Sequence, residues 1–223
     1  MQPVVRLRSV VCLLGRFPAL ADVDLDVAEG EVVLLSGGNG AGKTTLLRLL
    51  AGLVPLHSGE AEVLGHDLTR DRRSHRRELS LIGHETGCYD DLTVRENLRF
   101  ATRAAGARMD AADGALDRLG LEPLADITHG RLSAGQRRRL ALAVGIAREP
   151  RLLLLDEPHA GLDADGREVL DALLGQAAGE GRTVVLVSHE LDRARALAGR
   201  EVVLLAGQAD GIGTARPKER AAT

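Results

Sequence analysis

Aromatic residues are almost absent from this chain of 223 residues. Phe17, Tyr89 and Phe100 are the whole set, and there is no tryptophan. Proteins that bind single-stranded nucleic acid stack the bases on aromatic side chains, so this chain has little from which to build such a surface. The formal net charge is -3, from 29 basic and 32 acidic residues. The chain therefore lacks the excess of basic residues that is typical of a nucleic-acid-binding domain. We expect no nucleic acid among its partners.

Cysteines and long apolar runs are also scarce. Cys12 and Cys88 are the only cysteines; they match no metal-binding spacing, and so few suit a reducing cytosol better than a disulfide scaffold. A membrane-spanning helix requires a run of about 18 apolar residues, and the sequence contains no such run. Residues 1–6 lack the apolar core of a signal peptide. We expect a cytoplasmic protein that could work at a membrane only through another chain.

Short apolar runs alternate with stretches of helical pattern along much of the chain. Continuous apolar character over four or five residues is typical of strands that are buried on both faces of a parallel sheet. Strands that alternate with helices predict an α/β fold with a doubly wound core. The predicted strands cover 32–35, 152–155, 184–187 and 202–205, and the predicted helices cover 43–53, 136–148, 166–178 and 190–197.

Two other patterns indicate smaller lobes beside this core. Acidic and apolar residues alternate over 22–27, and a similar alternation occurs over 5–8 and 60–64. Such alternation is typical of antiparallel strands with one face in water. The helical stretch between the core strands is too long for a plain connection. We expect one domain over 1–207, with an antiparallel β lobe at about 1–35 and 55–68, a helical lobe at about 91–148, and a flexible tail over 208–223.

The strongest motif is a glycine-rich segment that fits G-x-x-x-x-G-K-[ST]. It follows a predicted strand and opens a predicted helix, which is the context that a phosphate-binding loop requires and that a chance glycine-rich turn would lack. Its backbone N–H groups can turn toward phosphate oxygens, and the start of a helix favours negative charge. Lys43 would reach the β- and γ-phosphates, and Thr44 would offer its hydroxyl to Mg²⁺. The residues assigned to nucleotide binding are Gly37, Gly38, Asn39, Gly40, Ala41, Gly42, Lys43, Thr44 and Thr45.

Two acidic residues, Asp156 and Glu157, follow the apolar run at 152–155. Open α/β sheets bind their ligands at the carboxyl ends of the strands, where this pair is expected to lie. Asp156 would hold Mg²⁺, directly or through water, and Glu157 would act as the general base that polarises the attacking water. A pair of solvated acids is the alternative, which the phosphate-binding loop makes the weaker interpretation.

A third motif, Ser133-Ala134-Gly135-Gln136, heads a predicted helix. Ser133 and Gln136 have the S-x-x-Q spacing of a capping box, which would satisfy the first N–H groups of that helix. The same N–H groups could instead hold an anion, because Gly135 would let a phosphate approach closely. The residue types alone leave these two interpretations equal.

The order of these motifs resembles the ATPase subunit of ABC transporters. A phosphate-binding loop precedes Leu-Ser-Ala-Gly-Gln, then the run that ends in Asp156-Glu157, then Ser188-His189, and the similarity extends over about 4–207. The resemblance implies that Ser133, Ala134, Gly135 and Gln136 bind the γ-phosphate held by the opposite subunit. It further implies that Asp163 lies in the D-loop at the dimer interface and that His189 is the switch histidine that contacts the γ-phosphate.

The sequence departs from the family pattern at two positions. The family usually has an aromatic residue that stacks on adenine, whereas Leu14 aligns with this position and Phe17 follows three residues later. The family's Q-loop glutamine, which meets Mg²⁺ and the attacking water, aligns with His84. A neutral imidazole could still donate or accept a hydrogen bond there, and we assign His84 a catalytic role. Chance drift at this position is the alternative.

A narrower resemblance concerns the haem exporter used in cytochrome c maturation. Ile82-Gly83-His84, the segment 96–100 and the Leu-Ser-Ala-Gly-Gln signature are similar to its ATPase. This resemblance implies haem export. The ATPase of another exporter, for drugs or peptides, and a soluble ABC ATPase that drives an assembly scaffold are the alternatives. An ATPase that remodels DNA would need a long coiled-coil insertion and a basic surface, and the sequence has neither.

The family resemblance also implies the ligands and partners of the chain. The ligands are ATP and Mg²⁺, bound in a head-to-tail dimer of two copies or of this chain and a paralogue. The other partner is an integral-membrane transporter subunit, which would hold the protein on the inner face of the cell membrane. We expect this subunit to dock near residues 84–98, with Tyr89 and Leu92 as apolar anchors. The alternative for both residues is that they pack in the core of the helical lobe.

Overall fold

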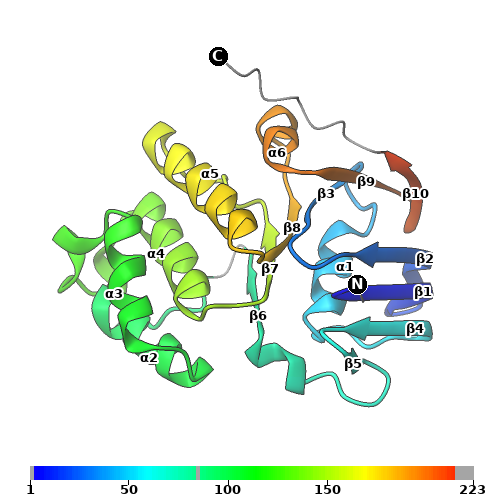
Figure 1. The fold of residues 1–223 in the computed structure, drawn as a ribbon, viewed down its shortest axis with the longest axis horizontal. Coiled ribbons are helices and arrows are strands. Elements are labelled where there is room, and N and C mark those ends of the chain that lie inside the picture. Colours follow the sequence, from blue (N-terminus) through cyan, green and yellow to red (C-terminus); the bar gives the residue numbers. More distant parts are fainter. Residues whose placement is uncertain (1–2, 84–85, 214–223) are drawn as a thin grey trace.

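The computed structural model describes residues 3–83 and 86–213, and its centre is a six-stranded sheet (Figure 1). Its strands are β3 (Val32–Ser36), β6 (Leu79–Ile82), β7 (Leu152–Asp156), β8 (Thr183–Val187), β9 (Arg200–Leu205) and β10 (Gln208–Gly213). They are ordered β10-β9-β3-β8-β7-β6, and all neighbours are parallel except β10 and β9. Every residue of β3, β7 and β8 is buried, which explains their continuous apolar character. The predicted parallel α/β core is confirmed.

Helices cover both faces of this sheet. They are α1 (Lys43–Leu50) on one face and α4 (Ala134–Ala147), α5 (Ala164–Gly179) and α6 (Leu191–Leu197) on the other. Successive side chains of a strand point to opposite faces. Leu35 of β3 accordingly packs in the core that contains α1, whereas Leu34 packs in the core that contains residues of α4 and α5. The sheet is therefore enclosed, and its strand ends are the places where polar side chains can meet a ligand.

A second sheet, which is antiparallel, lies against α1. It consists of β1 (Val5–Leu14), β2 (Phe17–Val27), β4 (Ser58–Val63) and β5 (His66–Asp67), in the order β2-β1-β4-β5. Burial alternates along β1 near its start, where Val5 and Leu7 are buried and Arg6 is exposed. Its buried side chains join the same core as Leu46 and Leu47 of α1. The period-two pattern of the sequence thus has the structural cause that was expected.

Helices form the end of the molecule opposite the antiparallel sheet (Figure 1). α2 (Val94–Ala105) and α3 (Met109–Arg118) pack on each other and on α4. α2 starts with a capping box, in which the Thr93 hydroxyl accepts from the Glu96 N–H and the Glu96 carboxylate accepts from the Thr93 N–H. It ends at Gly106, whose φ of 75° is left-handed. Short 3₁₀ turns η1 (Ser74–Arg77), η2 (Glu122–Leu124) and η3 (His129–Arg131) complete the chain.

The structure adds two strands to the six-stranded sheet that the sequence pattern does not predict. β6 is interrupted by the polar Ser80, whose buried hydroxyl donates to the Gly145 carbonyl at 2.9 Å, and this hides its apolar run. The prediction of a flexible tail from residue 208 is wrong at its start, because β10 pairs with β9 through a turn at Ala206 and Gly207. Both turn residues have positive φ, at 48° and 81°, as two-residue hairpin turns require. Backbone pairing at a sheet edge needs no side-chain periodicity.

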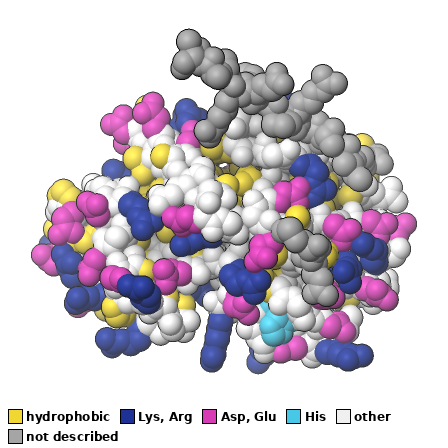
Figure 2. All heavy atoms as spheres, in the orientation of Figure 1, with side chains coloured by type: hydrophobic (Ala, Val, Ile, Leu, Met, Phe, Trp, Pro, Cys, Tyr) yellow, Lys and Arg dark blue, Asp and Glu magenta, His cyan; other side chains and the backbone are white. Residues whose placement is uncertain are grey.

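Within residues 3–83 and 86–213, no helix combines the length and the apolar character that crossing a bilayer demands. Acidic and basic side chains are interspersed over the face of the molecule drawn in Figure 2.

Candidate nucleotide-binding site

The phosphate-binding loop connects the carboxyl end of β3 to the first turn of α1. Gly37 and Gly42 have φ of 136° and 100°, which other residues rarely adopt. A Cβ at Gly37 would lie 2.2 Å from the Leu204 carbonyl oxygen, and one at Gly42 would lie 2.5 Å from that of Ala19. Glycine is therefore required at both positions. No side chain caps α1, so the N–H groups of its first turn can serve an anion.

Lys43 lies over this loop. Its Nζ donates to the carbonyl oxygens of Gly37 at 2.7 Å and Gly38 at 3.0 Å. These contacts hold one ammonium charge beside the inward-facing glycines, where phosphate oxygens would bind. The phosphate-binding role of this lysine stays a prediction, and the structure places its ammonium at the loop to which that prediction refers.

Thr44 and Asp156 meet although 112 positions separate them in the chain. The Thr44 hydroxyl donates to Asp156 Oδ2 at 2.8 Å. A hydroxyl and a carboxylate are oxygen ligands of the kind that Mg²⁺ prefers, and Mg²⁺ commonly takes its other ligands from water and phosphate. In the part of the chain that the structure describes, no group of three or more His, Cys, Asp or Glu could hold a metal ion. Thr44 and Asp156 therefore fit Mg²⁺ that is bound together with a nucleotide.

Glu157 follows β7 with a left-handed backbone, at a φ of 51°. Its N–H donates to the Val187 carbonyl, and its Oε2 accepts from the His189 N–H, both at 2.9 Å. Its Oε1 is buried, accepts no hydrogen bond from the described residues, and lies 3.5 Å from His189 Nε2. Glu157 thus has one anchored carboxylate oxygen and one that can accept a proton from water.

These groups line a hollow of 310 Å³. It is lined by residues from Asn39 to Thr45 and by Asp156, Glu157 and His189. Leu14 also lines it, whereas Phe17 does not and is 80% exposed. Of these two residues, the apolar Leu14 and not the ring of Phe17 therefore lies beside the phosphate-binding loop.

Arg138 is a residue of this region that the sequence analysis misses. It is 8% exposed, and burial lowers the pKa of its guanidinium, although the charges of Asp156 and Glu157 oppose this shift. The guanidinium donates to the carbonyl oxygens of Asp156 at 3.2 Å, Glu157 at 2.7 Å and Pro158 at 3.3 Å, and also to that of Gly83. A signal existed, because Arg138 shares helical spacing with Ala141, Leu142 and Gly145.

The signature loop, which we define as Ser133 to Gln136, forms the capping box that its spacing predicts. The Ser133 hydroxyl accepts from the Gln136 N–H at 3.3 Å, and Gln136 Oε1 accepts from the Ser133 N–H at 2.8 Å. Ser133 and Ala134 are exposed, and the loop does not line the 310 Å³ hollow. A Cβ at Gly135 would lie 3.2 Å from the Gly161 carbonyl oxygen. The signature loop thus lies next to Gly161, which precedes Asp163 by two residues.

Asp163 is exposed and caps α5, since its Oδ1 accepts from the Gly166 N–H at 2.9 Å. The structure therefore brings together the phosphate-binding loop, Asp156, Glu157 and His189. It places Ser133 to Gln136 and Asp163 apart from them. His84 lies outside the described residues.

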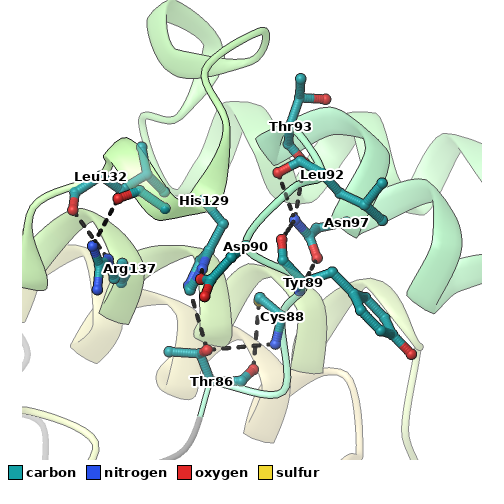
Figure 3. A network of polar contacts seen from close by, with 11 residues as sticks. Thr86, Cys88, Tyr89, Asp90, Leu92, Thr93, Asn97, His129, Leu132 and Arg137 are labelled. Atoms are coloured by element: carbon teal, nitrogen blue, oxygen red, sulfur yellow. Dashed lines mark hydrogen bonds and ion pairs between the residues drawn. The ribbon is translucent and has the colours of Figure 1, made fainter.

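A polar network links the segment after residue 85 to the signature loop (Figure 3). His129 is buried; its Nδ1 lies 2.6 Å from Asp90 Oδ1, and its Nε2 lies 3.4 Å from the Thr86 hydroxyl. Arg137 donates to the carbonyl oxygens of Gly130 and Leu132, both at 3.0 Å. These contacts hold the residues just before Ser133 against the segment that begins at Thr86.

Asn97 of α2 fixes the rest of this segment. Its Oδ1 accepts from the Tyr89 N–H at 2.8 Å, and its Nδ2 donates to the carbonyl oxygens of Tyr89 and Leu92 at 3.1 Å (Figure 3). The Tyr89 ring is thereby held at the surface, edge-on to Phe100 with ring centres 5.2 Å apart. Both rings are about half exposed, at 54% and 51%. Phe100 was missed by the sequence analysis, which named Leu92.

Tyr89 and Phe100 border a surface groove, which we define by these two residues with Leu81, Gly87 and Arg148. Its part beside the aromatic pair has a volume of 290 Å³. A neighbouring hollow of 740 Å³, which shares Leu81, Gly87 and Arg148, extends toward Thr44 and Asp156. Leu92 lines neither part. The groove therefore runs from the helical lobe to the edge of the nucleotide-binding site.

Comparisons with known proteins agree with this geometry. The chain matches the protein family described as ABC transporter over residues 20–160. It is 43% identical over 181 residues to the cytochrome c biogenesis ATP-binding export protein CcmA of Bordetella bronchiseptica, covering 79% of this chain and 80% of that protein. It is 38% identical over 220 residues to the sulfate/thiosulfate import ATP-binding protein CysA of Methylococcus capsulatus, covering 95% and 63%.

Among solved structures, a similar fold occurs in the ATP-binding cassette MJ0796, determined as a dimer in a post-hydrolysis state bound to ADP and Pi. The TM-score is 0.86 at 27% sequence identity, and the match covers 95% of this chain and 99% of that one.

Proposed function

Because this chain belongs to the ABC transporter family and is an ATP-hydrolysing enzyme of that family, we propose that it works as a head-to-tail dimer that powers a separate integral-membrane subunit. Each nucleotide site would take its phosphate-binding loop, Asp156, Glu157 and His189 from one chain. The signature residues Ser133, Ala134, Gly135 and Gln136 would come from the other chain, either a second copy or a paralogue. Asp163 would lie at the interface between the two.

The observation that carries this proposal is the separation of the two half-sites. Ser133 and Ala134 are exposed and do not line the hollow beside Lys43, so their capped helix start can serve a phosphate only from another molecule. The capping box and anion binding are compatible, since the box uses the N–H groups of Ser133 and Gln136 but not those of Ala134 and Gly135, which could bind an anion. A dimeric arrangement uses both surfaces and explains why one chain presents each of them to solvent.

Within such a site, the residues of this chain have distinct tasks. Lys43 and the N–H groups of the glycine-rich loop would bind the phosphates, and Glu157 Oε1 would take a proton from water. His189 would contact the γ-phosphate beside Glu157. Thr44 and Asp156 would hold Mg²⁺, which neutralises phosphate charge when it is bound. We also propose that His84, at the position of the family's glutamine, hydrogen-bonds in the same site.

A dimeric site predicts that ATP turnover per chain rises with protein concentration. Well below the dimerisation constant, a tenfold dilution should lower the rate per chain by about tenfold, because the active species is then proportional to the square of the concentration. Steady-state phosphate release over a dilution series, with sizing in parallel, measures this. A rate per chain that stays constant in a proven monomer would exclude the shared site.

Haem export in cytochrome c maturation is the transport function that we favour. Its support is the similarity to CcmA together with the Ile82-Gly83-His84, signature and 96–100 segments. Similarity to CysA keeps an import function as the second candidate. The neighbouring reading frames separate them: cytochrome-maturation genes beside one with several apolar runs of about 20 residues favour haem. Genes for sulfate uptake would contradict it.

The integral-membrane subunit is proposed to dock in the groove beside Tyr89 and Phe100. Tyr89 and Phe100 form an exposed aromatic pair beside this groove, and aromatic residues are enriched at the centres of protein interfaces. The network around Asn97 and His129 holds this groove against the signature loop. Docking there would place the protein on the inner face of the membrane through its partner.

Tyr89→Asp should disrupt this docking without affecting ATP binding. A carboxylate in a desolvated apolar contact is unfavourable, and loss of a central aromatic anchor should lower recovery of the membrane subunit by at least about tenfold. Pull-down from detergent-solubilised membranes, with nucleotide binding measured on the same preparation, tests this. Tyr89→Phe keeps the ring and should recover the partner normally; unchanged recovery with Tyr89→Asp would place the interface elsewhere.

A further inference from the structure

Arg138 is a buried charged side chain whose four hydrogen bonds to described residues all go to backbone carbonyls. It lies in the second turn of α4, only 8% exposed, and forms no ion pair with any residue of 3–83 or 86–213. Its contacts are instead the carbonyl oxygens of Asp156, Glu157 and Pro158 and that of Gly83. Burying a guanidinium is costly unless its donors are satisfied, so this arrangement needs all of those carbonyls.

The backbone that Arg138 contacts is conformationally unfavourable. Glu157 has a φ of 51°, a region in which residues other than glycine are strained. The guanidinium binds the carbonyl of Glu157 and also those of its two chain neighbours, Asp156 and Pro158. With the hydrogen bond from the Glu157 N–H to Val187, these contacts determine the direction in which the Glu157 side chain leaves the strand.

We propose that Arg138 is a positioning residue for ATP hydrolysis: from α4 it holds the backbone at the end of β7, and thereby places the Glu157 carboxylate for its reaction with water. The planar fork of arginine suits this task, because it presents several donors in fixed directions to carbonyl oxygens that converge from one side. A lysine would supply the charge but not the fork.

The position of Arg138 has a second consequence, which rests on the proposed dimer. α4 begins at the signature loop, so the helix that would serve the nucleotide of the opposite chain also holds the general base of its own site. The contact to Gly83 adds the end of β6, just before His84. A shift of α4 on dimer closure would therefore reach both Glu157 and the segment that follows Gly83.

Arg138→Gln tests this inference, with Arg138→Lys as the conservative variant. Arg103→Gln on the exposed face of α2 is the control for loss of one positive charge from the same lobe. For Arg138→Gln we expect kcat to fall by about 10- to 100-fold, as for other residues that orient a catalytic group. The dissociation constant for ATP should change by less than about threefold, since the phosphate-binding loop is untouched. Arg138→Lys should recover part of kcat, and Arg103→Gln should match the parent.

Two further measurements separate positioning from a general structural role. Backbone amide exchange over 156–158 should accelerate in Arg138→Gln, while exchange in β3 and β8 stays at the parental rate. The double variant Arg138→Gln/Glu157→Gln should retain the same residual turnover as Glu157→Gln alone, because Arg138 is proposed to act through Glu157.

Several outcomes would overturn the inference. These are a parental kcat in Arg138→Gln, an ATP affinity that falls in proportion to kcat, and an undiminished loss in the Glu157→Gln background. If Arg138→Gln does not fold, a folded Arg138→Lys with parental kcat and parental exchange over 156–158 contradicts it equally. A parent protein that binds but does not hydrolyse ATP at any concentration would instead contradict the proposed function.

Discussion

Glu157→Gln should remove nearly all ATP turnover and leave ATP bound. The change preserves the shape of the side chain, including an oxygen that can accept from the His189 N–H, but an amide cannot take a proton from water. Loss of a general base of this kind lowers kcat by about 10² to 10⁴. Phosphate release under saturating ATP measures the loss, and equilibrium binding of a fluorescent ATP analogue shows whether affinity survives.

The same variant should accumulate as an ATP-bound dimer, because in the proposed mechanism ATP binding closes the dimer and hydrolysis opens it. A sizing column run with ATP and Mg²⁺ should therefore show the dimer for Glu157→Gln and mainly the monomer for the parent. Glu60→Gln removes the same charge from an exposed position in β4 and should behave as the parent in both assays. Turnover at the parental rate in Glu157→Gln would mean that another group is the base.

Lys43→Ala should act one step earlier, on ATP binding. The ammonium lies 2.7 and 3.0 Å from the carbonyl oxygens of Gly37 and Gly38 and is held where phosphate oxygens would bind. A charge-assisted hydrogen bond is worth roughly 1.5–3 kcal/mol, so ATP affinity should fall by about 10- to 100-fold. Titration with ATP measures this, and no ATP-dependent dimer should form at concentrations that saturate the parent.

Lys218→Ala is the matched control, because Lys218 is the only other lysine in the chain. It should bind ATP normally. The two active-site variants must differ in a defined way: Glu157→Gln binds and dimerises without turnover, whereas Lys43→Ala binds weakly. Equal ATP affinity in Lys43→Ala and the parent would remove this lysine from the phosphate site.

Local sequence patterns were sufficient for the parallel core and for most residues of the nucleotide site. The phosphate-binding loop is contiguous, and backbone geometry at that point of the chain requires glycine at positions 37 and 42. Asp156 and Glu157 could be placed at a sheet edge because an apolar run of four residues precedes them. Such features depend on neighbours in sequence, and hydrophobic periodicity reports them directly.

Other features depend on residues that are remote in sequence. The Arg138 guanidinium binds carbonyls that lie 18 to 55 positions away. The exposed ring of Phe100 becomes part of an aromatic pair only because the fold holds Tyr89 beside it. β10 forms because a tight turn at Ala206 and Gly207 brings an edge within hydrogen-bonding reach, without any side-chain pattern.

By itself, therefore, the sequence determined which groups could be assigned chemistry: the phosphate-binding loop with Lys43 and Thr44, and the acidic pair Asp156 and Glu157, each in a short segment whose local conformation follows from its own residues. Only the tertiary structure decided how these groups are held and what they face. It joined Thr44 to Asp156 across 112 positions, turned Glu157 toward His189, and left the signature loop outside the hollow of its own chain. Those relations arise when distant segments pack together, and packing is a property of the whole chain that no local period encodes.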